Sequence, residues 1–317
     1  MKKFFKILMK ILLVVVLVLS IGIAVFLFIL SKNQNAPQKY WEKISTEGVI
    51  ENKYNHLGEY EVVKKTYDAP QDERDNNTNH FVVWYPEKEG KYPLVVMING
   101  SGTPCSKYEA VFEHFASWGY VIVGNDYGTN WDGKHASETL DFALNTEEIV
   151  KWIDTDKIAV GGHSQGGIGT FNAITEYENG NRYKAAFALS PTNNDLALQL
   201  QWGFQLGTEE QYAFRLEEIE IPMMIIAGTG PFDSDTVTPL AELQEQYAFL
   251  RGDKAAFRRA DDVDHGNILY EANGYVIAWL DLYLKDQEDN ENAFFGDHAE
   301  IRNNTRYQDF YSQKGTE

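Results

Sequence analysis

Five short apolar runs, each separated from the next by a longer stretch, constrain the fold of this chain more than any other feature. Polar and apolar residues do not alternate within these runs, as expected for strands that are buried on both faces of a parallel sheet. Helical patterns occupy most of the stretches between them, which is the succession that builds an α/β fold. The sequence therefore predicts parallel strands at residues 120–125, 157–161, 185–190, 223–227 and 255–259.

Three earlier apolar runs, at residues 60–67, 80–85 and 93–98, bring the predicted sheet to eight strands. The first two alternate more clearly and lie close together in the chain, which favours an antiparallel edge. No internal repeat or change of composition divides residues 55–286, so we expect one mostly parallel α/β domain there, followed by an acidic tail at residues 287–317. Helices are expected on both faces of the sheet, at residues 108–117, 137–153, 168–177, 239–250 and 270–285.

The first thirty residues have the pattern of a membrane anchor. Residues 1–10 hold four lysines and no acidic residue, and residues 11–30 are uncharged and mostly apolar. A helix of twenty residues is about 30 Å long, which is the thickness of the hydrocarbon core of a bilayer. Because positive charge beside a span stays in the cytoplasm, we expect a single-pass protein of the cell membrane with a polar stalk at residues 31–54 and an extracytoplasmic folded domain. A cleaved secretory signal is the alternative interpretation.

Charge and composition argue against a nucleic-acid partner, an internal disulfide and a bound cofactor. The formal net charge is −19, and such an acidic surface repels nucleic acid. The expected partners are the lipid bilayer, through the N-terminal helix, and a small-molecule substrate, with the protein a monomer.

Cys105 is the only cysteine, so an internal disulfide is excluded and Cys105 is interpreted as a small packed residue. The acidic residues before His265 have no second histidine at ligand spacing, so neither a metal nor another cofactor is expected.

Residues Gly162-His163-Ser164-Gln165-Gly166 match the pattern G-x-S-x-G between a predicted strand and a predicted helix. This is the setting of a nucleophile elbow, in which a serine occupies a sharp turn between the two elements. The glycines remove Cβ atoms that would collide with neighbouring backbone, and the start of the helix favours developing negative charge. Ser164 is therefore predicted to be a catalytic nucleophile, with His163 a structural residue. A plain glycine-rich turn is the alternative.

A serine nucleophile needs a histidine base and a carboxylate that orients the base, and in this fold the acid and then the histidine follow the serine. His265 and His298 are the histidines after Ser164. His265 lies in the loop between the last predicted strand and the last predicted helix, where it would reach the strand ends, whereas His298 lies in the tail. The acid is expected in one loop that holds Asp233 and Asp235. We prefer Asp235, which directly precedes the next helix, and Asp233 remains open.

Two backbone N–H groups are expected to stabilise an oxyanion beside the serine. One is the N–H of Gln165, directly after the nucleophile. The other belongs to the glycine-rich loop after the third predicted strand, where Ser101 is preferred and Gly102 is the alternative. Tyr127 and Trp131 follow the next strand, at the edge of the sheet where ligands bind in such folds. They are predicted to line the substrate site, or else to be ordinary packing residues.

These motifs resemble, in order and spacing, those of the α/β-hydrolase superfamily, and most of all its branch of cutinases (polyester hydrolases), chlorophyllases and dienelactone hydrolases. The resemblance covers about residues 60–285 and implies an α/β-hydrolase fold. It also implies that Ser164 attacks an ester carbonyl, His265 transfers the proton and Asp235 orients the imidazole. Asn99 departs from the many relatives that have histidine before the oxyanion glycine, which bears on the shape of the loop. The segments that carry the resemblance are GHSQGG, PLVVMINGSG, YEAVFEHFASWGYVIVGNDYG, DTVTP and DHGN.

The sequence as a whole predicts a membrane-anchored serine hydrolase that cleaves carboxylic esters through an acyl-enzyme intermediate. An acyltransferase or a peptidase could use the same three side chains, because only the acceptor or the bond cleaved would differ. A non-catalytic surface binding domain on the same fold is the remaining alternative. The presence of all three residues in the required order argues against it.

Overall fold

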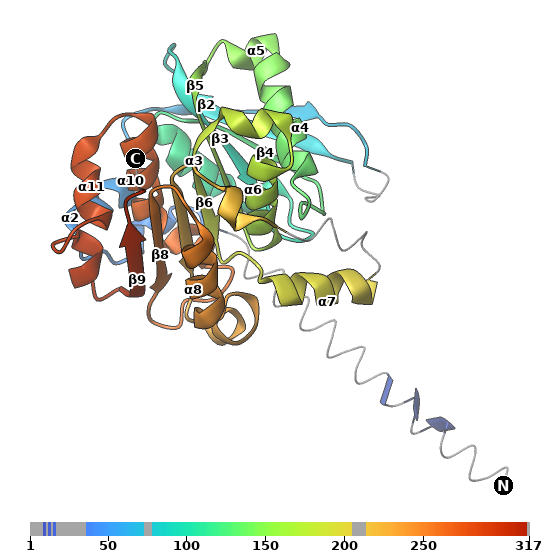
Figure 1. Cartoon of the computed structure of the whole chain (residues 1–317). Coiled ribbons are helices and arrows are strands. Elements are labelled where there is room, and N and C mark those ends of the chain that lie inside the picture. The colour runs from blue at the N-terminus through green and yellow to red at the C-terminus, as the bar shows by residue number, and fades with distance from the viewer. Residues whose placement is uncertain are drawn as a thin grey trace, which may run out of the picture.

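The computed structural model of the chain describes residues 36–72, 78–204 and 214–315, together with residues 9, 10, 12, 13, 15 and 16. At its centre is a nine-stranded sheet in the order β1-β2-β4-β3-β5-β6-β7-β8-β9 (Figure 1). The six neighbouring strands from β4 to β8 run parallel, and β1, β2 and β9 form antiparallel pairs at the two edges. The strands are β1 Val62–Asp68, β2 His80–Pro86, β3 Tyr92–Ile98, β4 Val121–Asn125, β5 Ile153–His163, β6 Tyr183–Leu189, β7 Met223–Ala227, β8 Lys254–Arg259 and β9 Tyr307–Gln313.

The predicted parallel centre and the predicted antiparallel edge are confirmed, but the count of eight strands is wrong. The ninth strand, β9, comes from the acidic C-terminal segment, for which no role was predicted. It pairs antiparallel with β8 and covers the backbone N–H and C=O groups that β8 would otherwise leave at an open edge. Tyr307 at its start packs edge-on against Phe257 of β8, with ring centroids 5.4 Å apart. The folded unit therefore includes residues beyond 286.

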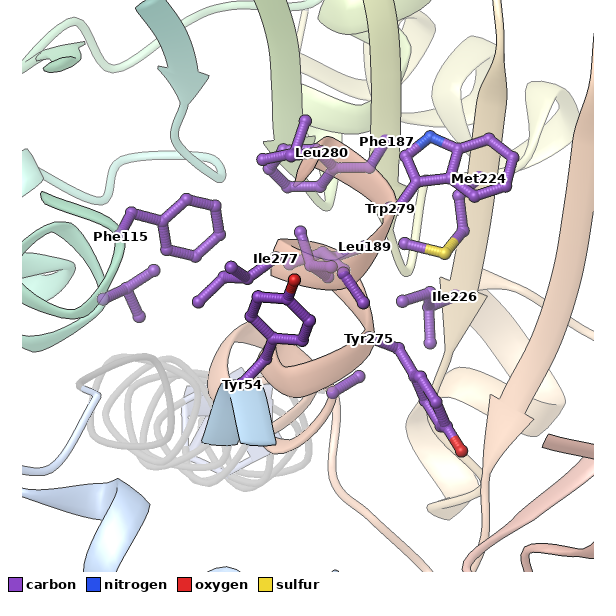
Figure 2. Packing of buried hydrophobic residues seen from close by; sticks show 14 of the residues in the cluster. Tyr54, Phe115, Phe187, Leu189, Met224, Ile226, Tyr275, Ile277, Trp279 and Leu280 are labelled. Atoms are coloured by element: carbon purple, nitrogen blue, oxygen red, sulfur yellow. The ribbon is translucent and has the colours of Figure 1, made fainter. Parts of the chain in front are cut away.

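Helices cover both faces of the sheet because successive residues of a strand point to opposite sides (Figure 1). Val95 and Met97 of β3 belong to the cluster that packs under α3 and α10, whereas Leu94 and Val96 belong to the cluster under α4, α6 and α8. Figure 2 shows the first cluster, where side chains of α10 meet those of β6 and β7. The helices are α2 Val49–Asn55, α3 Glu109–Ser117, α4 Lys134–Asn145, α5 Glu147–Val150, α6 Gln165–Thr175, α7 Asn194–Phe204, α8 Leu240–Phe249, α9 Ile268–Glu271, α10 Asn273–Leu284 and α11 Glu291–Phe294.

The segment predicted as a polar stalk, residues 31–54, is instead folded onto the domain where the structure describes it. Three aromatic side chains explain the difference, because Tyr40, Trp41 and Tyr54 are all buried in the cluster of α3 and α10. The hydroxyl of Tyr40 lies 2.6 Å from His114 Nδ1 of α3 and accepts a hydrogen bond of 2.6 Å from Asn273 Nδ2 of α10. The polar residues between these aromatics obscured their role in the sequence.

The predicted membrane span, residues 11–30, lies almost entirely outside the described residues. Within the parts of the chain that the structure describes, none of the helices combines the length and the apolar character needed to cross a bilayer. The anchor therefore stays a prediction from the sequence.

Candidate active site

Parallel strands bring the predicted site residues to one edge of the sheet. The carboxyl ends of four parallel strands, β3, β5, β7 and β8, lie at this edge. The loops that follow these strands carry, in that order, Ser101, Ser164, Asp233 and His265. This is the edge at which open α/β sheets bind ligands. We call it the carboxyl edge, and we call residues 99–103 the β3 loop.

Ser164 occupies the sharp turn that the sequence predicts. β5 ends at His163, α6 begins at Gln165, and Ser164 between them has φ 60° and ψ −124°. A positive φ is rare for a residue with a side chain and stores strain that the surrounding structure must hold. The Ser164 N–H donates a 2.9 Å hydrogen bond to the carbonyl oxygen of Leu189 in β6, which holds the turn against the neighbouring strand. The side chain is partly exposed.

The two glycines of the motif are required because backbone approaches them closely. A Cβ at position 162 would lie 2.0 Å from the carbonyl oxygen of Gly166, and a Cβ at position 166 would lie 2.4 Å from the carbonyl oxygen of Ile98. Real Cβ atoms essentially never approach backbone this closely. Gly166 thus lets the elbow pack directly on the end of β3, which brings Ser164 beside the β3 loop.

The acid that meets His265 is Asp233, and our preference for Asp235 is wrong. Asp233 Oδ1 lies 2.5 Å from His265 Nδ1, and both side chains are buried. Both aspartates belong to the short helical turn Asp233–Val237. Side chains that are two positions apart on such a turn point in directions roughly half a turn apart. Asp233 consequently faces the interior, and Asp235 is exposed.

Three surrounding contacts keep Asp233 in its charged carboxylate form. Burial works to raise its pKa, but the attraction of His265 and the hydrogen bonds from His265, Ser190 and Gly228 outweigh burial and lower the pKa. The Ser190 hydroxyl donates at 2.5 Å and the Gly228 N–H at 2.8 Å, both to Oδ2. Because folding lowers this pKa, ionised Asp233 stabilises the fold above the pH of about 4 at which a free aspartate titrates, and this contribution is lost as the pH falls.

The contact with Asp233 fixes which nitrogen of His265 is available for chemistry. A carboxylate accepts hydrogen bonds, so His265 Nδ1 carries the proton in this pair. In a neutral imidazole the other nitrogen, Nε2, then has the lone pair that can take up a proton. Phe232 packs edge-on against the ring at 5.3 Å between centroids and the His163 ring lies 4.7 Å away, so the imidazole is confined on two sides.

The predicted oxyanion donors and their alternative differ in whether their N–H groups are already hydrogen-bonded. Gly102 is excluded as the alternative, because its N–H donates a 3.0 Å hydrogen bond to the carbonyl oxygen of Gly128. Within residues 36–72, 78–204 and 214–315, the N–H groups of Ser101 and Gln165 form no hydrogen bond. Gln165 also begins α6, whose N-terminus favours negative charge. The Gln165 side chain donates from Nε2 to the same Gly128 carbonyl at 3.0 Å.

The two predicted wall residues differ in their surroundings. Tyr127 is buried, its ring stacks 3.6 Å from the ring of His135, and its hydroxyl donates to the carbonyl oxygen of Pro70. This packing corrects the prediction that Tyr127 lines the substrate site. Trp131 is buried as well, but in a small cluster with Ile168 of α6 and Ala197 of α7. Its place beside the helix that leaves the elbow is compatible with a wall, and that role stays a prediction.

Sequence reasoning missed Ser190, whose hydroxyl donates to Asp233. Ser190 follows the buried strand β6 and has φ 41°, so a polar residue with strained backbone stands beside the elbow. A serine directly after a buried apolar strand was the only sequence signal. Tyr108 was missed as well, although its hydroxyl contacts both the β3 loop and His163.

Comparisons with known proteins identify a matching family and several relatives. A model of the family described as Chlorophyllase matches residues 50–244. Cutinase est1 of Thermobifida alba is 24% identical over 216 residues, which are 64% of each chain, so the match spans just under two thirds of that relative. Cutinase 2 of Thermobifida cellulosilytica is 26% identical over 64% of this chain and 72% of its own. Bis(hydroxyethyl) terephthalate hydrolase of Streptomyces coelicolor is 25% identical over 64% of this chain and 62% of its own length.

Proposed function

Because this chain belongs to the chlorophyllase family of α/β-hydrolases, we propose that it is a serine hydrolase that cleaves carboxylic esters. Ser164 is the nucleophile, His265 the base and Asp233 the carboxylate that orients it. The N–H groups of Ser101 and Gln165 receive the oxyanion. One observation supports this assignment above the others: the 2.5 Å contact of Asp233 with His265 Nδ1, at the edge where the strained elbow presents Ser164.

The proposed reaction proceeds in two steps, acylation of Ser164 and deacylation by water. His265 Nε2 takes the proton of the Ser164 hydroxyl as its oxygen adds to the ester carbonyl carbon, and the carbonyl oxygen becomes an oxyanion. The C–O bond to the leaving alcohol then breaks, and His265 returns the proton to that alcohol. Water then adds to the carbonyl carbon of the acyl-enzyme while His265 Nε2 takes a proton from it. The bond from that carbon to the Ser164 oxygen breaks, His265 returns the proton to Ser164, and the carboxylic acid is released. Asp233 keeps Nδ1 protonated throughout and stabilises the imidazolium.

The names of the relatives favour ester hydrolysis over acyl transfer and peptide cleavage. Two of the relatives are cutinases and one is a hydrolase of a terephthalate ester, so each of these names refers to an ester. The identities of 24–26% support the reaction class rather than a particular substrate. The acidic surface predicted from the net charge of −19 further favours neutral esters over anionic ones.

The test is hydrolysis of p-nitrophenyl esters by the purified protein, with acyl chains from acetate to octanoate. We expect turnover with saturation, and a preferred acyl length that reports the room at the carboxyl edge. Matched p-nitroanilide substrates and an added alcohol acceptor test for amide cleavage and acyl transfer. No turnover of any ester by folded protein would contradict the proposal and leave a non-catalytic binding domain.

The membrane anchor is a second part of the proposal, and it rests on residues 11–30. The Ala36 N–H donates a 3.0 Å hydrogen bond to the carbonyl oxygen of Lys107, which lies shortly after the β3 loop. The chain from Leu30 to Ala36 can span at most about 20 Å. An anchor ending at Leu30 would therefore hold the domain close to the bilayer by the side that carries the β3 loop.

We expect the full-length protein to sediment with membranes and to resist extraction by sodium carbonate, whereas a form starting at residue 36 should stay in the supernatant. Protease added to intact cells should remove the domain, as an extracytoplasmic placement requires. A soluble full-length protein, or a mature N-terminus beyond residue 30, would contradict the anchor without bearing on the ester chemistry.

A further inference from the structure

A buried tyrosine connects the β3 loop to the elbow. Tyr108 stands just before α3 and is fully buried, yet its hydroxyl makes two polar contacts. The Gly100 N–H donates to Tyr108 Oη at 2.9 Å, and Tyr108 Oη lies 3.2 Å from His163 Nδ1. Gly100 directly precedes Ser101, the proposed oxyanion donor, and His163 directly precedes Ser164. The hydroxyl therefore joins the two segments that flank the proposed reaction centre.

The direction of each hydrogen bond follows from one carbonyl group. His163 Nε2 lies 2.8 Å from the backbone oxygen of His265, which can only accept, so Nε2 carries the proton. Burial, helped by the nearby His265, lowers the pKa of His163 to about 3, so its ring is neutral near pH 7 and Nδ1 is an acceptor. Burial raises the pKa of Tyr108, whose hydroxyl keeps its proton and donates it to Nδ1.

We propose that Tyr108 and His163 are positioning residues that hold the Ser101 N–H and the His265 backbone in fixed places on either side of Ser164. The bonds run without a gap from the Gly100 N–H through the Tyr108 hydroxyl and the His163 ring to the His265 carbonyl. This inference rests on the proposed function, because it concerns the same reaction centre. Neither residue touches the reacting atoms.

A steric observation places the same groups together independently of the hydrogen bonds. A Cβ at position 100 would lie 3.4 Å from both His163 Nδ1 and the Cβ of Ser164, and 3.5 Å from Tyr108 Oη. The β3 loop, the elbow and the bond network thus meet at one point. Oxyanion donors act through their fixed orientation. A displacement of the backbone at Gly100 would therefore weaken stabilisation of the transition state more than it weakens substrate binding.

The first test is Tyr108→Phe, which removes one oxygen and keeps the ring. We expect kcat for p-nitrophenyl butyrate to fall about tenfold or more, since loss of a complete oxyanion donor costs about 10²–10³, with KM changed less than twofold. The matched control is Tyr183→Phe, because Tyr183 is buried at the start of β6 and its hydroxyl has no partner among the described residues. That control should keep wild-type kcat.

The second test separates a positioning network from simple packing. His163→Leu should lower kcat, whereas His163→Gln, whose amide can still donate to the His265 carbonyl, should retain more of it. Adding Tyr108→Phe to His163→Leu should cost far less than Tyr108→Phe alone, because the network is already broken. Unchanged kcat in Tyr108→Phe, a change confined to KM, or additive losses would overturn the proposal.

A third measurement does not depend on activity. Nitrogen-15 NMR of histidine-labelled wild-type protein should show His163 neutral and protonated on Nε2 from about pH 5 to pH 9, with an Nδ1 resonance that moves in Tyr108→Phe. A proton on Nδ1 in the wild type would overturn the proposed network even in an active enzyme. If the protein showed the expected tautomer but hydrolysed no ester, the proposed function would be contradicted, and the positioning role with it.

Discussion

Replacing Ser164 by alanine is expected to lower kcat for p-nitrophenyl butyrate by about 10⁶-fold, the loss seen when a serine hydrolase is deprived of its nucleophile. The backbone of the elbow holds the strained φ of 60° through contacts of main-chain atoms, which alanine keeps. The thermal midpoint should therefore stay close to that of the wild type. Steady-state kinetics and thermal unfolding of the same preparations measure both quantities.

The matched control for this prediction is Ser312→Ala, which changes a serine of β9 at the edge of the sheet far from the elbow in the chain. It should leave kcat unchanged. Turnover by Ser164→Ala at more than a few per cent of the wild-type rate, in the absence of contaminating esterase, would mean that another group performs the chemistry.

Replacing Asp233 by asparagine is expected to lower kcat by about 10⁴-fold, the effect of the equivalent change in a well-studied serine protease. The amide removes the charge that stabilises the His265 imidazolium. It can also donate its own hydrogen bond to Nδ1, which would move the ring proton to Nε2 and leave no lone pair to accept the serine proton. The pH dependence of kcat, together with kcat itself, measures the loss.

Asp235→Asn provides the comparison, because it makes the same chemical change two residues away on an exposed side chain. We expect its kcat to lie within about twofold of the wild type, as is usual for surface substitutions. If Asp235→Asn were the more damaging variant, the carboxylate that orients His265 would not be the one in contact with it in this structure.

The elbow could be predicted from sequence because its requirements are local. A strand, a glycine-flanked serine and a helix follow one another within about twelve residues, and the close approach of Gly162 and Gly166 to backbone explains why larger residues are absent. His265 could be predicted because it is the only histidine in a loop at the correct place in the order of elements.

The acid could not be chosen from sequence because Asp233 and Asp235 share one loop. Which of them meets His265 depends on the helical turn Asp233–Val237 and on two donors, Ser190 and Gly228, that come from the ends of neighbouring strands. The contacts of Asp233 with Ser190 and His265 join residues far apart in the chain, so no local pattern predicts them. The preference for the residue nearest the next helix used the local pattern alone.

Two other differences have the same origin. Tyr127 is buried because His135 stacks on it and Pro70 accepts its hydroxyl, and both partners are separated from it in the chain. β9 was missed because its polar residues do not alternate as a half-buried strand does, so that its identity as a strand depends on pairing with β8. Local sequence predicts elements well where they are apolar and periodic, and less well where a distant partner defines them.

The central claim is that Ser164, His265 and Asp233 act together, and labelling with a fluorophosphonate tests it most directly. We expect one adduct per folded wild-type molecule, mapped by peptide mass spectrometry to Ser164. We also expect labelling to be strongly slowed in Asp233→Asn and unchanged in Asp235→Asn. An adduct on another residue, or no adduct on folded wild-type protein, would contradict this claim.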